Sequence, residues 1–280
     1  MRMQNNKPIN SINHGFTVVE ILVIAPIVIL VIGAFIVAIV AMTGDVLASR
    51  ASNKLVYDTQ TALSTIEQDV KVSGAFLATN NITIQSPQGD GDGIIPFKNA
   101  KSGTNGNSLI LNAYATTTNP LNSIRNLYYK PVTPGDCTIR QTSPVMINII
   151  YFVKSNTLWR RVIMPVDYSS GCNGDNPSPP WQQPTCSIQT GSDPCITSDT
   201  KLVDNLSNNG FVINYLSSPN SSTAISTASD SGLSDYLRQN AMASATTVEI
   251  IINTSMTAAG RDITQTGTVK STSPNNNISV

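Results

Sequence analysis

Histidine and charged residues are scarce in this chain. The single histidine is His14, and charged residues make up 12% of the 280 positions, divided into 17 basic and 17 acidic side chains. This balance produces no overall field that would favour nucleic acid, and no basic stripe interleaved with aromatic residues indicates DNA binding. No nucleophile elbow and no phosphate-binding glycine motif occurs either. We therefore expect neither a cofactor nor an enzyme, although a catalytic pair of carboxylates brought together by folding stays open.

The dominant feature that is present is an apolar run over 21–44, which contains no charged side chain. About 20 apolar residues suffice for a helix to cross the hydrocarbon core of a bilayer. A secretory signal peptide places its small-residue cleavage site after the apolar region, whereas here Gly15 and Phe16 precede it. A carboxylate at the edge of a membrane span is costly unless it is neutralised or paired, so Glu20 indicates a functional group.

The N-terminal run Gly15-Phe-Thr-Val-Val-Glu-Ile-Leu22 resembles the N-terminus of type IV prepilins. The resemblance implies that a prepilin peptidase cuts after Gly15, that Phe16 is methylated, and that Glu20 pairs with the N-terminal amine of a neighbouring subunit. Removal of residues 1–15 would also remove His14, which excludes a histidine triad or a histidine-ligated metal site in the mature chain. The alternative is an uncleaved signal anchor, which Glu20 disfavours.

Beyond the apolar run, apolar residues continue at spacings of three and four, which predicts helix to about Ser73. Pro26 and Gly33 interrupt the first half, and a proline tends to kink a helix. The residues of the predicted buried face are Leu47, Ala51, Leu55, Leu63, Ile66 and Val70.

The predicted fold class is α+β, a pilin-like lollipop whose long N-terminal helix packs on a mainly antiparallel β-sheet head. The domain boundaries that we expect are 1–15 for the leader, 16–44 for the transmembrane and assembly helix, 45–78 for its amphipathic second half, and 79–280 for the head.

Short β-branched and aromatic segments bounded by Gly, Pro or Asn predict the strands of the head. Tyr151 and Trp159 are expected to anchor the sheet, although an exposed stacking platform for a sugar or a base is an alternative. A hairpin is expected between 146–153 and 157–164, which are joined by residues 154–156. An Asn-Asn-Gly turn is expected between 201–206 and 211–216, and a turn at Ala259 and Gly260 between the last two strands. The predicted strands are 108–114, 124–129, 146–153, 157–164, 201–206, 211–216, 248–253 and 263–269.

Three stretches lack periodicity and are predicted to be loops: 79–107, 165–200 and 219–234. In the first, Asp90 and Asp92 alternate as calcium ligands do, but the full calcium-loop signature is missing, so a plain turn is favoured and no metal site is expected. The second is rich in proline and cysteine and is our candidate for contact with a partner or a surface.

Cysteine occurs four times, with no C-x-x-C spacing that would indicate zinc or redox chemistry. Since an export helix places the head outside the cytoplasm, two disulfides are expected. Three pairings are possible, and proximity along the chain favours Cys186 with Cys195 and Cys137 with Cys172.

The order of the predicted strands resembles PilW-like minor pilins and J-class pseudopilins. The residues that carry this resemblance are Tyr151, Leu158, Trp159, Arg160, Leu202, Val203, Asn205, Leu206, Phe211, Tyr215, 248–252 and 260–263. The cysteine-rich loop is not part of the usual pattern.

This resemblance implies a minor pilin or pseudopilin that is assembled into a type IV pilus or a related filament, at or near its tip. Adhesion, motility, DNA uptake and secretion are not distinguished. Its expected partners are the prepilin peptidase, other pilins or pseudopilins, the pilus assembly platform and the membrane. The expected location is a single pass through the cytoplasmic membrane with the head outside, and then a surface or periplasmic filament. A helix-anchored surface adhesin that does not enter a filament is the alternative.

Overall fold

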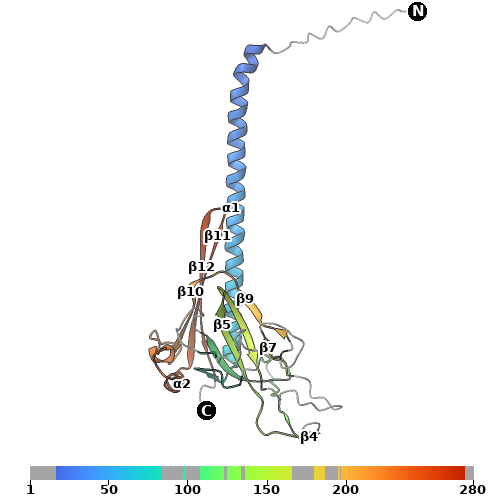
Figure 1. Ribbon diagram of the computed structural model, residues 1–280, viewed down its shortest axis with the longest axis vertical. Helices are drawn as coiled ribbons and strands as arrows, with labels where there is room; N and C mark the ends of the chain where they lie inside the picture. The colour runs from blue at the N-terminus through green and yellow to red at the C-terminus, as the bar shows by residue number, and fades with distance from the viewer. Residues whose placement is uncertain are drawn as a thin grey trace, which may run out of the picture.

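A single long helix projects from a β-rich head in the computed structural model (Figure 1). The predicted α+β class, with its long N-terminal helix and antiparallel head, is therefore confirmed. The structure describes residues 17–83, 97–98, 108–122, 125–133, 136–165, 180–186, 195 and 197–274.

The helix α1 (Val18–Val72) contains 55 residues and is about 83 Å long at 1.5 Å per residue. It continues through Pro26, since one missing backbone hydrogen bond does not end a helix of this length. Its end at Val72 agrees with the predicted end near Ser73, whereas the boundary expected for the second half of the helix, 45–78, extends six residues past this end. Ser73 is extended and its hydroxyl donates to the carbonyl of Val70 at 2.8 Å, so the chain leaves the helix there.

The first sheet has five antiparallel strands in the order β1-β2-β5-β6-β9. Their bounds are Ala75–Phe76 for β1, Leu109–Tyr114 for β2, Met146–Lys154 for β5, Thr157–Ile163 for β6 and Thr200–Val203 for β9. The predicted hairpin is confirmed, with β5 and β6 joined by Ser155 and Asn156. Both turn residues have positive φ, as a two-residue turn that matches strand twist requires.

The second sheet has three antiparallel strands in the order β10-β11-β12. They are β10 (Leu206–Leu216), β11 (Thr247–Ala258) and β12 (Arg261–Thr272). The turn predicted at Ala259 and Gly260 is confirmed, and both residues have positive φ. The β11–β12 hairpin reaches along α1 beyond the rest of the head (Figure 1), and at its tip Arg261 pairs with Asp45 of α1 at 2.9 Å.

The prediction of a strand pair joined by an Asn-Asn-Gly turn was wrong. The segment 201–203 lies in β9 of the first sheet, whereas Leu206 and 211–216 lie in β10 of the second, and Asn209 and Gly210 lie in an irregularity inside β10. A Cβ atom at Gly210 would lie 2.4 Å from the carbonyl oxygen of Asn253, so the glycine permits close approach to β11 rather than a chain reversal.

The smaller elements also differ from the prediction in places. The expected strand at 124–129 is reduced, among its described residues, to one isolated bridge between Leu127 and Thr116. No helix was predicted at α2 (Asp235–Ala243), a short helix that is capped by the Ser234 hydroxyl and follows the 3-10 helix η2 (Ser226–Ser229). The remaining strands form two short pairs: β3 (Pro131–Thr133) with β4 (Asp136–Arg140), and β7 (Thr185–Cys186) with β8 (Thr197–Ser198).

The five-stranded sheet is buried on both faces, which explains why β2 and β5 are mostly apolar instead of alternating, with Asn112 and Asn148 as the buried polar exceptions. One face, with Leu111, Ile149 and Tyr151, shares a core with Ile66 of α1. The opposite face forms a smaller cluster, whose buried members are Leu77, Ile82, Ile110, Ile150, Phe152 and Ile163.

The second half of α1 is seated on the β11–β12 sheet as well. Gly267 of β12 lies so close to the helix that a Cβ atom there would come within 2.7 Å of side-chain atoms of Thr59 and Leu63. The predicted buried face is confirmed from Ala51 onward, whereas Leu47 is half exposed. The helix is therefore packed against the head only from its middle to its C-terminus.

Candidate functional site

The first half of α1 is an apolar stem, defined here as residues 18–43, in which every side chain is exposed. Leu22 and Leu30 are each 72% exposed and Phe35 is 66% exposed. The helix is long and apolar enough to cross a membrane, and no residue of its most apolar stretch is buried by the rest of the chain. Because exposed apolar area of this extent marks a membrane or protein contact, the stem is the main candidate interaction surface.

The N-terminal end of the stem is closed by a capping box between Thr17 and Glu20. The Thr17 backbone N–H and hydroxyl donate to Glu20 Oε2 at 2.8 and 2.9 Å, and the Glu20 N–H donates to the Thr17 hydroxyl at 3.3 Å. Sequence reasoning considered Glu20 only as a partner for another subunit, although the Thr-x-x-Glu spacing is itself the signature of this cap. The predicted cleavage and methylation residues, Gly15 and Phe16, lie outside the described residues.

Where α1 meets the head, three polar side chains form a nearly enclosed cluster: Asp69 from the helix, Tyr151 from β5 and Arg160 from β6. Arg160 grips Asp69 with two nitrogens, Nε at 2.6 Å from Oδ2 and Nη2 at 3.3 Å from Oδ1, and the Tyr151 hydroxyl donates to the same carboxylate. Burial and the negative charge of Asp69 raise the pKa of Tyr151 well above 10. Burial opposes the charge on Arg160, but Asp69 outweighs it and raises the pKa of the guanidinium. The cluster fixes the direction in which the stem leaves the head.

We expect the Tyr151→Phe variant to lose about 1 kcal/mol of stability near neutral pH, the typical worth of one hydrogen bond. The folded chain holds the phenol in its neutral form, so this contribution is complete below the unfolded pKa of about 10 and is lost as the pH rises through the higher folded pKa. Alkaline unfolding followed by circular dichroism should therefore show a shallower fall in stability above about pH 10 for Tyr151→Phe. Tyr57→Phe, at an exposed helix position, is the matched control and should follow the parent protein; identical alkaline curves for all three proteins would contradict the assignment.

A second ion pair lies deeper in the head, between Arg161 of β6 and Asp199. The guanidinium Nη2 is 2.6 Å from Asp199 Oδ2, and the side chains are 0% and 2% exposed. The Thr185 hydroxyl donates to Asp199 Oδ1 at 2.9 Å and accepts from the N–H of Val162 at 3.0 Å. Arg161 also lies over the rings of Phe97 and Phe152, 5.3 and 5.0 Å from their centroids. This network ties the segment that carries β7 and β8 to the main sheet.

One disulfide lies beside this network, because the N–H of Asp199 donates to the carbonyl of Cys186 at 2.8 Å. The predicted Cys186–Cys195 disulfide is confirmed, and both residues are buried. Cys137 lies on β4 and Cys172 lies outside the described residues, so their pairing stays a prediction. The described part of 165–200, which was predicted to be a loop, is partly packed against the sheet, because Gln182, Thr185 and Asp199 are buried there.

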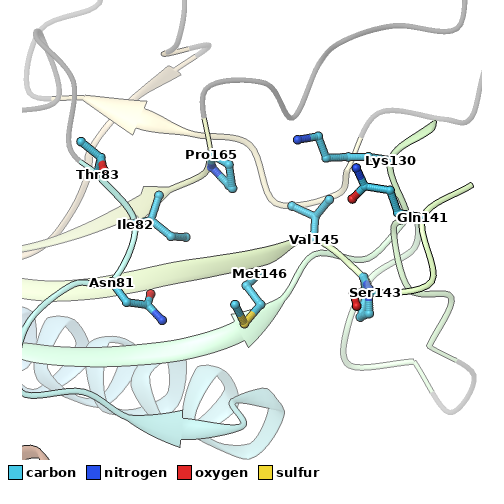
Figure 2. Close-up of a pocket in the computed structure, with 10 residues that line it drawn as sticks. Asn81, Ile82, Thr83, Lys130, Gln141, Ser143, Val145, Met146 and Pro165 are labelled. Carbon is cyan, nitrogen blue, oxygen red and sulfur yellow. The ribbon is translucent and has the colours of Figure 1, made fainter. Parts of the chain in front are cut away.

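Two hollows of the head are lined by described residues. One, of about 460 Å³, lies between the start of β5 and the segment after β1, with Ile82, Val145 and Met146 among its apolar walls and Lys130 and Gln141 at one side (Figure 2). The other, of about 430 Å³, lies between the C-terminal end of α1 and the 181–185 segment and is mainly polar. Among the described residues there is no group of three side chains able to hold a metal ion, and the calcium candidates Asp90 and Asp92 fall outside that part of the chain.

Comparison with protein families, with curated proteins and with solved structures gave no match. Three features of the chain itself therefore indicate its function: an exposed apolar stem, a capped N-terminal carboxylate, and a head packed against the second half of the same helix. The long apolar helix, the antiparallel head and the disulfide are consistent with a pilin-like lollipop.

Proposed function

We propose that this chain is a minor pilin or pseudopilin, made as a membrane-anchored precursor, cut after Gly15 and assembled through its stem into a type IV pilus or a related filament. The observation that carries the proposal is the division of one continuous helix into two halves. Residues 18–43 leave all their side chains exposed, whereas Leu55, Ile66 and Val70 are buried in the head. A helix needed only as part of the head would end where the head ends.

The stem needs an apolar environment throughout the life of the protein. Removing one large aliphatic or aromatic side chain from water is worth roughly 1.5 to 3 kcal/mol, and the stem carries such residues at most positions. A bilayer satisfies this need in the precursor, and neighbouring stems satisfy it in a filament. Extraction from lipid is then nearly neutral, because one apolar surrounding replaces another.

The polar end of the stem supports a role in register. Glu20 is the only charged residue between Thr17 and Gly44, so a subunit that buries its stem must neutralise or pair this carboxylate. Pairing with the freed N-terminal amine of a neighbouring subunit would satisfy both charges. The size of the head, 79–280, favours an initiating or occasional subunit, because large heads crowd a helical fibre.

A helix-anchored surface adhesin is the second candidate. The polar hollow between α1 and the 181–185 segment favours it, since a subunit acting only in assembly needs no such site. The two roles are compatible in one protein. The proposed roles are structural and adhesive, and we propose no catalysis, because the chain cut after Gly15 contains no histidine.

The intact mass of the protein purified from membranes tests the proposal. We expect loss of residues 1–15 and the added mass of one methyl group on Phe16 in cells with an active prepilin peptidase. A Gly15→Leu variant, whose bulky side chain replaces the small residue at the cleavage point, is the matched control and should keep its full length. Full-length parent protein in those cells would overturn the pilin assignment and favour the uncleaved anchor.

A further inference from the structure

The polar hollow has the composition of a binding site rather than of a packing defect. Its volume of about 430 Å³ falls within the range of roughly 300 to 1,000 Å³ that small-molecule sites occupy. Its walls come from six elements and two loops far apart in the sequence, including Gln68 and Asp69 of α1, Arg160 of β6, and Thr200 of β9. Half of the described lining side chains are amides or hydroxyls, which both donate and accept hydrogen bonds.

An exposed tryptophan stands at the rim. Trp181 is 57% exposed, and Leu121 on the opposite loop is 50% exposed, although most large apolar side chains of the head are buried. Trp181 is one of only two tryptophans in the chain. An indole ring offers a large flat apolar surface together with one N–H donor, and such a ring stacks on the apolar face of a cyclic ligand.

The backbone around Trp181 is held in place before any ligand arrives. The Trp181 N–H donates to the carbonyl of Thr116 at 2.6 Å, and the Gln182 side-chain oxygen accepts from the N–H of Thr116 at 2.9 Å and from its hydroxyl at 3.3 Å. Thr185, two residues further along, is tied to the Arg161–Asp199 pair. A preorganised segment loses little entropy on binding, which favours affinity.

The charge of the hollow argues for an uncharged ligand. Arg160, the only cation among the described residues that line the hollow, is already held by both oxygens of Asp69 and lies within the cluster that contains Tyr151. The two charges cancel, so a phosphate, sulfate or carboxylate group would find no unpaired cation among the lining residues. Gln68, Thr197 and Thr200 are exposed in the hollow and offer neutral hydrogen-bonding groups.

From these four observations we infer that the hollow binds a neutral saccharide. A pyranose ring presents one face of C–H groups, which suits stacking on Trp181, and a rim of hydroxyl groups, which suits the amides and hydroxyls of the walls. The inference goes beyond filament assembly and does not depend on it, because every group involved belongs to the head of one chain.

The test uses the full-length chain in detergent, screened against an array of neutral and acidic oligosaccharides. We expect binding to neutral members and a shift of tryptophan emission on titration with the best of them in solution. The Trp159→Phe background leaves Trp181 as the single reporter, since the chain has two tryptophans. Trp181→Ala should lower the affinity at least about tenfold, because it removes the proposed stacking surface, and Gln183→Ala by about threefold to tenfold.

Tyr236→Ala is the matched control, because Tyr236 is an exposed aromatic residue on α2, outside the hollow, and its removal should leave the affinity unchanged. The circular dichroism of each variant shows whether the head is still folded. Preference for sialylated or sulfated oligosaccharides, absence of binding to every glycan, or equal affinity of folded Trp181→Ala and the parent would each overturn the inference. None of these outcomes bears on cleavage after Gly15, which the intact mass tests separately.

Discussion

The Arg161→Ala variant is expected to lose about 3 to 5 kcal/mol of folding stability, the cost of leaving one partner of a buried ion pair without the other. Asp199 would keep only the Thr185 hydroxyl, while its side chain is 2% exposed and therefore out of reach of bulk water. The truncation would also leave a void beside the rings of Phe97 and Phe152. Since typical domains are stable by only about 5 to 15 kcal/mol, this variant should be close to unfolding.

Chemical denaturation followed by circular dichroism, with the full chain in detergent, measures this loss. Lys201→Ala is the matched control: its ammonium group pairs with Asp204 at 3.0 Å, but both side chains are at least one-third exposed, so about 0 to 1 kcal/mol is expected. The double variant Arg161→Met/Asp199→Leu removes both charges at once and should recover much of the stability lost by Arg161→Ala. Equal stability of Arg161→Ala and Lys201→Ala would show that the buried pair does not hold the 181–199 region to the sheet.

The second large effect concerns Glu20, whose replacement by Val should leave the precursor in the membrane and impair its entry into filaments. If the carboxylate pairs with a neighbouring amine, losing an interaction worth only about 1.4 kcal/mol lowers incorporation about tenfold. The fraction of protein in sheared filaments relative to the membrane pool measures this effect.

The capping box complicates the interpretation of Glu20→Val, because the same side chain also binds Thr17. Two further variants separate the roles. Glu20→Gln preserves the cap, since glutamine serves in a capping box, but removes the charge. Thr17→Ala keeps the charge and removes the cap's hydroxyl, at a cost of about 1 kcal/mol of helix stability. We expect Glu20→Gln to fail in incorporation as Glu20→Val does and Thr17→Ala to assemble; normal incorporation of Glu20→Gln would show that the charge does not set register.

Elements encoded by local pattern were predicted well. The apolar spacing through Leu55, Ile66 and Val70 placed both the length and the buried face of α1, because helical periodicity is visible in a short window. The hairpins at Ser155 and at Ala259 were predicted because their turn residues lie between runs of β-branched residues. The Cys186–Cys195 disulfide followed from proximity along the chain.

Features that join distant segments were missed. Asp69, Tyr151 and Arg160 come from three elements and meet only after the helix packs on the sheet, so no spacing indicates their cluster. The split of 201–216 between two sheets depends on the approach of Gly210 to Asn253, which a local turn pattern imitates. The burial of Gln182 and Asp199 could not be predicted either, because a proline-rich segment without periodicity gives no sign of the polar partners that will satisfy it.

The amino-acid sequence by itself determined the two-part character of this protein. A charge-free apolar run followed by an amphipathic helix must expose one half of itself to lipid or to other stems, and the β-branched segments after it must form a sheet. Only the tertiary structure decided the direction of the stem relative to the head and the position of the polar hollow. The direction of α1 depends on Asp69, whose partners Tyr151 and Arg160 lie 82 and 91 residues further along the chain. The polar hollow exists only where the helix end, the sheet and the 181–185 segment meet. Such contacts arise from packing over long sequence separations, which no local pattern records.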